Sequence, residues 1–146
     1  MTFLSDLICS KTGEAFPADR LQNLSSAGAP LLARYDLERA RRELKQESIT
    51  TGIQSMWRYA SLLPVRHPRN IVTLGEGNTP ILHAQRLGSH LGIHNLLVKD
   101  DSFNPTGTFK ARGMSCAVSM AKELGATKLA APSAGNAAGA LSAYAA

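Results

Sequence analysis

Two polar loops hold the residues most able to do chemistry. The first runs from Ser102 to Gly113 and contains Lys110, and the second runs from Pro132 to Gly139 and contains Ser133 and Asn136. Each loop follows a short apolar run and precedes a helical pattern. Ligands of open α/β sheets bind where strands end and helices begin. We therefore expect the two loops to face one ligand site.

Lys110 lies in the first turn of the helix that the pattern predicts from Thr108 to Leu124. The positive end of a helix dipole disfavours a cation there by a few tenths to about 1 kcal/mol. A neutral amine is the form that attacks a carbonyl carbon in Schiff-base chemistry. The alternative is a lysine whose ammonium group reaches solvent from the helix start. The local sequence leaves both interpretations open.

The second loop offers backbone N–H groups at a predicted helix N-terminus, which suits a carboxylate or a phosphate. Ser133 and Asn136 are also common N-cap residues, whose side chains accept hydrogen bonds from the first helical turn. From this loop by itself, anion binding and simple capping both remain open.

The elements around these loops alternate between strand and helix. Asn95–Lys99 is a continuous apolar run, typical of a strand buried on both faces of a parallel sheet, and Lys128–Ala131 predicts a second strand. Gly125 suits the C-terminus of the helix before it, and a further helix starts near Ala137. We predict an α/β fold with a parallel sheet flanked by helices.

One side of the helix predicted over 108–124 is apolar and is expected to pack on that sheet. The stripe is widened by Met114, Val118 and Ala121. Its central members are Phe109, Gly113, Ala117, Met120 and Leu124.

The rest of the chain divides into two further regions. Residues 1–30 are short apolar pieces broken by glycine and proline, which indicates a ribbon-like region of small strands and turns. Residues 31–73 are predicted as a helical arm, with helices over Tyr35–Glu47 and Met56–Leu63. Asp36 is the expected N-cap of the first helix. Residues 74–146 then form the α/β region.

Composition excludes several classes of protein. Among 146 residues, 44% are hydrophobic and 18% are charged, which is ordinary for a globular chain and unlike a disordered one. No run approaches the roughly 20 apolar residues that span a bilayer, and the N-terminus lacks the basic start of a signal peptide. We therefore expect a cytoplasmic protein with no membrane partner.

The net charge of +5 raises the question of a nucleic-acid surface. Residues 20–69 carry nine Lys or Arg and four Asp or Glu, so this region holds the whole excess. Its acidic side chains alternate with the basic ones, which is typical of a solvated helix face. No stripe of a single sign forms, and we expect no nucleic-acid partner.

Three motifs in this order resemble the pyridoxal-phosphate enzymes of the tryptophan synthase β-subunit-like fold. Within that group they are most similar to the threonine synthase family. The motifs are Gly75-Glu76-Gly77-Asn78-Thr79-Pro80, Asn104-Pro105-Thr106-Gly107-Thr108-Phe109-Lys110-Ala111-Arg112-Gly113-Met114, and Ser133-Ala134-Gly135-Asn136-Ala137.

The resemblance implies a role for each matching residue. Lys110 would form the Schiff base with pyridoxal phosphate and would later carry the proton, and Phe109 would pack beside the cofactor. Asn136 would hydrogen-bond the ring hydroxyl oxygen of the cofactor, and Thr79 would line the substrate pocket. The substrate carboxylate would be held by Ser133, Ala134, Gly135 and Ala137.

The implied reaction converts O-phosphohomoserine and water to threonine and phosphate, catalysed by a carbon–oxygen lyase that is a homodimer at full length. A threonine or serine dehydratase-like lyase of the same fold is the alternative, and a non-catalytic fragment of either is another. Related dehydratases typically follow the loop asparagine with histidine, whereas Ala137 stands here. This difference favours the synthase.

The chain departs from the family in two ways. Some relatives begin with a zinc ribbon that carries paired cysteines, but here Cys9 stands alone and Thr12 takes the partner position. Because structural zinc takes four ligands, we expect a ribbon-like shape without metal. The glycine-rich cup for the cofactor phosphate, which follows the asparagine loop in relatives, is missing. We therefore expect an N-terminal portion with an incomplete fold, inactive by itself.

Overall fold

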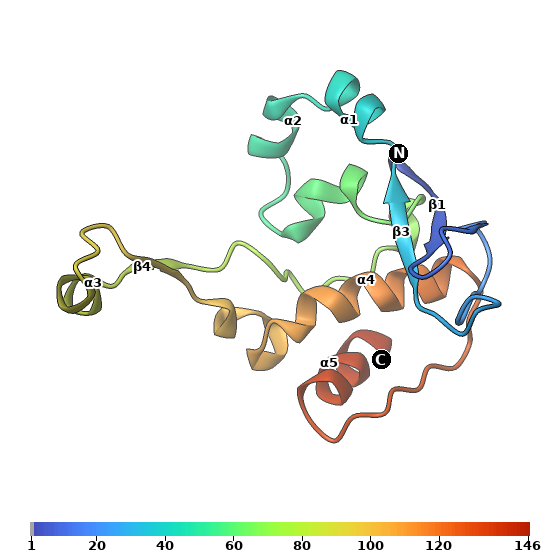
Figure 1. Cartoon of the computed structure of the whole chain (residues 1–146). Helices are drawn as coiled ribbons and strands as arrows, with labels where there is room; N and C mark the ends of the chain where they lie inside the picture. Colours follow the sequence, from blue (N-terminus) through green and yellow to red (C-terminus); the bar gives the residue numbers. More distant parts are fainter. Residues whose placement is uncertain (1) are drawn as a thin grey trace.

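The computed structural model describes residues 2–146 and is organised around one long helix, α4 (Lys110–Glu123). Helix α5 (Asn136–Ala145) packs along α4, as Figure 1 shows. Two apolar clusters form beside α4, one around Trp57 and one around Tyr144. Their buried members are Met56, Trp57 and Val65 in the first and Ala111, Val118 and Tyr144 in the second.

The C-terminal end of α4 follows the prediction. Gly125 adopts a left-handed conformation, with φ +78°, and its N–H donates to the carbonyl of Lys122 at 3.1 Å. The N–H of Ala126 reaches the carbonyl of Ala121 at 2.9 Å. This pair of bonds is a Schellman motif, which satisfies carbonyl groups that a helix end leaves free.

The face that α4 buries differs from the predicted stripe. Phe109, Gly113 and Ala117 are exposed, whereas Met120 is partly buried against the Trp57 cluster. The buried face holds Ala111, Ser115, Val118 and Ser119. Two serines can be buried there because their hydroxyl groups hydrogen-bond to the backbone of Val72 and to Glu76. A pattern of apolar residues alone does not reveal such a polar contact.

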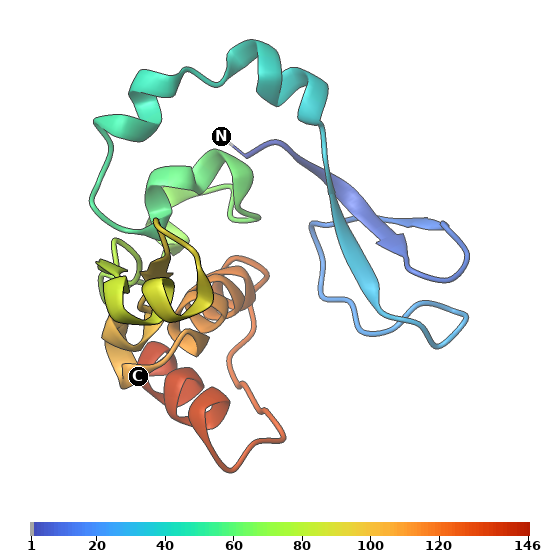
Figure 2. The same ribbon diagram turned by 60° about the vertical axis from the view of Figure 1, so that its left-hand side comes forward.

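The N-terminal region is a three-stranded antiparallel sheet in the order β2–β1–β3. It contains β1 (Leu4–Cys9), β2 (Ala15–Phe16) and β3 (Leu31–Tyr35). Helices α1 (Leu37–Glu43) and α2 (Gln46–Thr50) then arch from β3 towards the short helix η1 (Met56–Leu62) (Figure 2). A second 3-10 turn, η2 (Pro68–Asn70), follows.

The first helix of this arm begins as predicted but ends early. The side chain of Asp36 accepts the N–H of Arg39 at 2.8 Å, so the expected N-cap is confirmed. Leu44 is extended, with ψ 115°, and divides the single helix predicted over 35–47 into α1 and α2.

The strands after residue 74 correct the prediction of a parallel sheet. Strand β4 (Ile81–His83) pairs antiparallel with β5 (Leu97–Lys99), and α3 (Gln85–Leu91) lies between them. Residues 128–131 form no strand. A strand needs a neighbouring backbone with free N–H and C=O groups. In the described chain β5 pairs with β4, which lies shortly before it in sequence, whereas residues 128–131 have no such neighbour. The chain is mixed α/β, as predicted.

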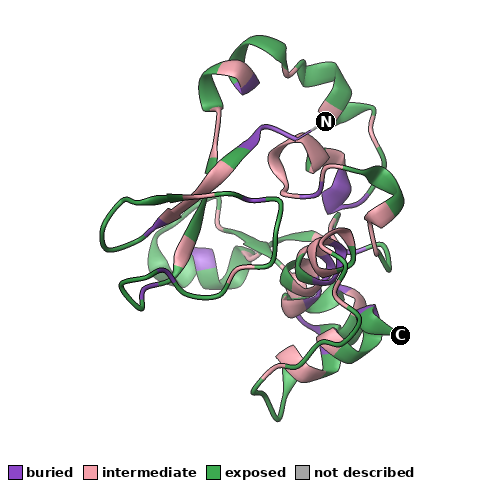
Figure 3. Cartoon of the chain, turned by 90° about the vertical axis from the view of Figure 1, so that its right-hand side faces the viewer, coloured by how far each residue is buried: buried purple, intermediate pink, exposed green. Residues whose placement is uncertain are grey.

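Much of the apolar surface remains exposed. The chain exposes 9619 Å², whereas a compact protein of 15.6 kDa exposes about 7,250 Å². Figure 3 shows that buried residues are confined to short stretches of the ribbon. The segment from β4 to β5 extends away from α4 (Figure 1) and contributes many exposed apolar side chains. These are Ile81, Leu82, Leu87, Leu91, Ile93, Leu97 and Val98.

Two 3-10 turns, η3 (Asp101–Phe103) and η4 (Pro105–Gly107), connect β5 to α4. They place Lys110 at the first position of α4. Within residues 2–146, no helix combines the length and apolar character needed to cross a bilayer.

Candidate functional site

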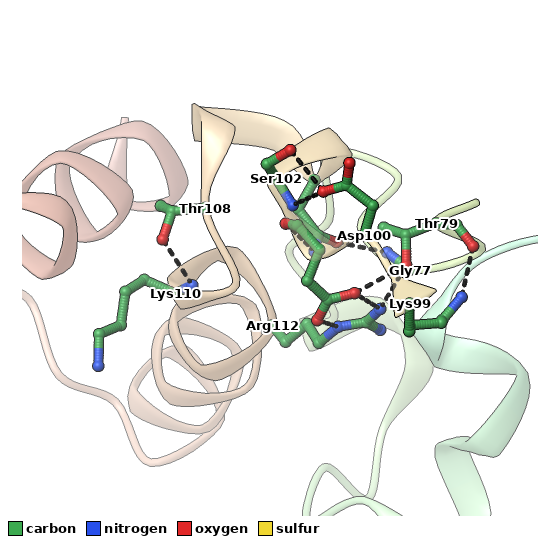
Figure 4. Close-up of polar contacts among 10 residues, drawn as sticks. Gly77, Thr79, Lys99, Asp100, Ser102, Thr108, Lys110 and Arg112 are labelled. Atoms are coloured by element: carbon green, nitrogen blue, oxygen red, sulfur yellow. Dashed lines mark hydrogen bonds and ion pairs between the residues drawn. The ribbon is translucent and has the colours of Figure 1, made fainter. Parts of the chain in front are cut away.

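Lys110 presents a free amine at the start of α4. Its Nζ lies 4.5 Å from the centre of the Phe109 ring, and its side chain points away from the polar cluster around Arg112 (Figure 4). Among the described residues it makes no side-chain hydrogen bond or ion pair, whereas Lys99 donates to the carbonyl of Thr79. The amine of Lys110 is therefore available to a ligand.

The hydrogen bonds of the loop before α5 show which of its groups cap the helix and which remain free to bind an anion. Ser133 Oγ accepts the N–H groups of Gly135 at 3.2 Å and of Ala138 at 3.3 Å, so this hydroxyl caps the helix. The N–H groups of Asn136 and Ala137 find no acceptor in the part of the chain that the structure describes. They remain able to receive an anion at the positive end of α5.

The two predicted loops lead into helices that are neighbours in the fold. Helix α5 contacts both α4 and the η4 turn that precedes Lys110. Asn136, Ala134 and Gly135 are exposed, and Ala137 is half-buried. A hollow of about 650 Å³ opens near Tyr144, and its lining includes neither Lys110 nor Asn136. The candidate residues thus lie on open surface at the starts of two helices that pack together.

Thr79 belongs to a polar cluster on another side of the first turn of α4 (Figure 4). Its hydroxyl donates to Asp101 Oδ1 at 2.7 Å and accepts from Arg112 at 3.3 Å. Arg112 binds both carboxylate oxygens of Asp101, at 2.9 and 2.8 Å. The Arg112 guanidinium and the Thr79 hydroxyl hold the pKa of Asp101 well below its usual range. The hydroxyl of Thr79 is therefore already used within the protein.

Glu76 is a fully buried carboxylate, with 0% of its surface exposed. Oε1 accepts from Trp57 Nε1 at 2.8 Å, Ser115 Oγ at 2.6 Å and Thr73 Oγ1 at 3.0 Å. Oε2 accepts from the N–H of Leu74 at 3.0 Å and from the Tyr144 phenol at 2.6 Å. Burial acts to raise the pKa of Glu76, but these hydrogen bonds outweigh it and leave the pKa lowered.

Glu76 lies within the Gly75–Pro80 motif, but the motif by itself predicts no role for it. A signal was present, because Glu76 is the only acidic residue between Glu47 and Asp100. An isolated acid between apolar residues and turn formers is a candidate for a buried and fully paired carboxylate. The pairing of Asp101 with Arg112 was also missed, since the two residues lie on separate elements.

The buried thiol of Cys9 contacts polar groups of the protein. Its thiol lies 3.0 Å from the Ser25 hydroxyl and accepts the N–H groups of Lys11 and Thr12, each at 3.4 Å. Hydrogen bonding with Ser25 and Thr12 lowers the pKa of Cys9 to about 7. Across residues 2–146, no three His, Cys, Asp or Glu side chains come together as metal ligands would.

Comparison with known families agrees with the lysine and asparagine motifs. Residues 72–146 match the family described as pyridoxal-phosphate dependent enzyme. The chain belongs to this family, whose cofactor is pyridoxal phosphate.

Its relatives include several threonine synthases, which agrees with the resemblance seen in the motifs. The threonine synthase of Methanocaldococcus jannaschii is 37% identical over 138 residues, covering 94% of this chain and 34% of the relative. That of Methanosarcina acetivorans is 38% identical over 94% of this chain and 33% of its own length. That of Synechocystis is 46% identical over 60% and 23%. The chain spans about a third of the length of the first two relatives.

Proposed function

We propose that this chain supplies the lysine-bearing part of an enzyme that converts O-phosphohomoserine and water to threonine and phosphate. The free amine of Lys110, at a helix start within the family-matched segment, is the observation that supports it most directly. The open N–H groups of Asn136 and Ala137 on the adjacent helix support an anionic ligand beside that amine.

The described residues fit pyridoxal phosphate. In the proposed site Lys110 attaches the cofactor and later holds the proton at its Nζ, while the exposed Phe109 ring packs beside the cofactor. The Asn136 amide binds the ring hydroxyl oxygen. Pyridoxal phosphate supplies the electron sink that makes the carbon–oxygen bond labile, and the protein supplies orientation and electrostatics.

The substrate carboxylate is proposed to lie at the start of α5. There the N–H groups of Asn136 and Ala137 have no acceptor among the described residues, and Ser133 holds the turn through Gly135 and Ala138. The exposed Ala134 forms the rest of this loop. Thr79 is proposed to line the substrate pocket, where it acts through the Asp101 carboxylate and the Arg112 guanidinium that its hydroxyl contacts.

The experiment uses the longest chain that the gene encodes. Pyridoxal phosphate is added, the lysine–cofactor bond is reduced with borohydride, and peptides are analysed by mass. We expect label on Lys110, none in Lys110→Ala, and normal labelling in Lys122→Ala, which changes an exposed lysine near the other end of α4. Equal labelling of Lys110→Ala and the wild type would overturn the assignment of Lys110.

A second assay separates the two reaction classes. Phosphate released from O-phosphohomoserine is measured beside ammonia released from threonine. We expect phosphate only, and ammonia alone would show a dehydratase. The 146-residue chain by itself is expected to release neither, because it spans about a third of the length of its relatives. Size-exclusion chromatography and cell fractionation would test a full-length homodimer and a cytoplasmic location.

A further inference from the structure

We propose that Glu76 is the positioning residue of the cofactor site, and that its carboxylate sets the place of the Asn136 helix relative to the Lys110 helix. This inference rests on the proposed function. It concerns a buried group that the proposed chemistry does not use directly, because Glu76 is fully buried and its five donors occupy both oxygens.

The donors to Glu76 come from four separate parts of the chain. Trp57 belongs to η1, Ser115 to α4 and Tyr144 to α5, while Thr73 and Leu74 precede the glutamate in its own loop. One carboxylate therefore connects the helix that carries Lys110 with the helix that carries Asn136. An apolar contact of similar area could slide, but hydrogen bonds of 2.6 Å to two helices specify a position.

The loop that carries Glu76 is itself held in place. The carbonyl of Glu76 accepts the N–H of Met56 at 2.7 Å. Gly77 follows with φ +103°, and a Cβ there would lie 2.5 Å from the backbone nitrogen of Met56. The N–H of Gly77 donates to Asn104 Oδ1 at 2.9 Å, and Asn104 lies in the segment that leads to Lys110. Glu76 thus projects from backbone that cannot shift without moving η1.

Helix α5 depends on Tyr144 for its polar attachment. Within residues 2–146, the Tyr144–Glu76 bond is the only side-chain hydrogen bond from α5 to a residue outside its own N-terminal loop. The remaining contact with α4 is apolar, since the Tyr144 ring packs with Ala111 and Val118, Leu141 lies against this cluster and Ala140 is fully buried. Apolar packing is non-directional, so removing the one directional contact is expected to let the helix tilt.

A tilt of α5 would change the position of Asn136 relative to Lys110. Asn136 lies eight residues before Tyr144, which is about 12 Å along a helix, so a tilt of roughly 10° moves it by about 2 Å. Lys110 lies five residues before Ser115, about 7.5 Å away along α4. A displacement of about 1 Å is enough to impair a binding or catalytic geometry.

The test compares Tyr144→Phe and Glu76→Gln with Tyr59→Phe. Tyr59→Phe removes the same hydroxyl from a tyrosine that is 45% exposed and makes no hydrogen bond through it among the described residues. Hydrogen exchange is measured first, segment by segment and without cofactor. We expect faster exchange over residues 136–145 in Tyr144→Phe and in Glu76→Gln, with α1 unchanged, and no effect in Tyr59→Phe.

Cofactor affinity is then measured on the same folded proteins by titration with pyridoxal phosphate. We expect binding weaker by about fivefold in Tyr144→Phe, the loss of one net hydrogen bond, and by more in Glu76→Gln. Borohydride trapping should still place the label on Lys110. A purely structural role would raise exchange and leave the affinity of the folded protein unchanged.

The outcomes separate this inference from the proposed function. Wild-type affinity in Tyr144→Phe, with or without faster exchange in α5, overturns the positioning role while the proposed function stands. A wild-type protein that takes up no pyridoxal phosphate overturns the proposed function, and the positioning role is overturned with it. Weaker binding together with faster exchange confined to α5 supports both.

Discussion

The phenol of Tyr144 donates a 2.6 Å hydrogen bond to the carboxylate of Glu76, although 68 residues separate them along the chain. Both groups are buried, so each changes the ionisation of the other. Burial and the Glu76 carboxylate raise the pKa of Tyr144, which keeps the phenol protonated as a donor. The contact therefore depends on an ionised glutamate and a neutral tyrosine.

The first prediction concerns acid stability. The pKa of Glu76 is lower in the folded protein than its ordinary value of 4.5. Folding is therefore favoured by ionised Glu76, and this stabilisation is fully present above pH 4.5 and is lost as the pH falls through the folded-state pKa. Glu76→Gln should unfold more easily at neutral pH by about 1–3 kcal/mol, because the oxygen that becomes NH₂ can no longer accept a hydrogen bond. Trp57 loses its acceptor if this is Oε1, and Leu74 loses its acceptor if it is Oε2.

Urea unfolding at several pH values checks this prediction. The difference in unfolding free energy between the wild type and Glu76→Gln should shrink as the pH is lowered below 4.5. A difference that stays constant down to the acid transition would show that Glu76 is not the ionised group of this network.

The second prediction concerns the close approach of Gly77 to η1. Gly77→Ala places a methyl group against the Met56 nitrogen in a left-handed conformation, which should lower the unfolding free energy by about 2–5 kcal/mol. Gly113→Ala is the matched control, because a Cβ at this exposed position of α4 has no heavy atom within 4 Å. It should stabilise the protein by about 0.5–1 kcal/mol. Equal thermal midpoints for the two variants would contradict the packing described.

The third prediction concerns the ion pair between Asp101 and Arg112. Each side chain is 31% exposed, so solvent screening limits its contribution. A double-mutant cycle with Asp101→Asn and Arg112→Gln should give a coupling free energy of about 0.5–1 kcal/mol at low salt, decreasing as salt is added. Additive effects of the two substitutions would mean that the pair contributes nothing to stability.

The fourth prediction concerns Asn136. Because this side chain is exposed, Asn136→Ala should change the unfolding free energy by less than about 0.5 kcal/mol. It should weaken the binding of pyridoxal phosphate while leaving the covalent label on Lys110. Isothermal titration and peptide mass analysis measure the two effects separately. An affinity equal to that of the wild type would remove Asn136 from the proposed site.

The helix ends show which parts of the fold can be predicted from sequence. Asp36 caps α1 and Gly125 ends α4 as expected, because each depends on hydrogen bonds to residues within five positions. The pairing of β5 could not be predicted in the same way. A strand can pair with any neighbouring backbone that has free N–H and C=O groups, and nothing in its own residues specifies which one. Here that neighbour is β4, in antiparallel orientation.

The candidate site shows the same difference between local and long-range information. Residue types and their order were enough to identify a lysine at a helix start and a polar loop before the next helix, and to indicate the family to which the chain belongs. The tertiary structure decided which groups remain free for a ligand. Lys110 is free while Lys99 and Thr79 are bound to protein groups, and Glu76 joins α4 to α5. These choices depend on contacts between residues far apart in the chain, which no local pattern encodes.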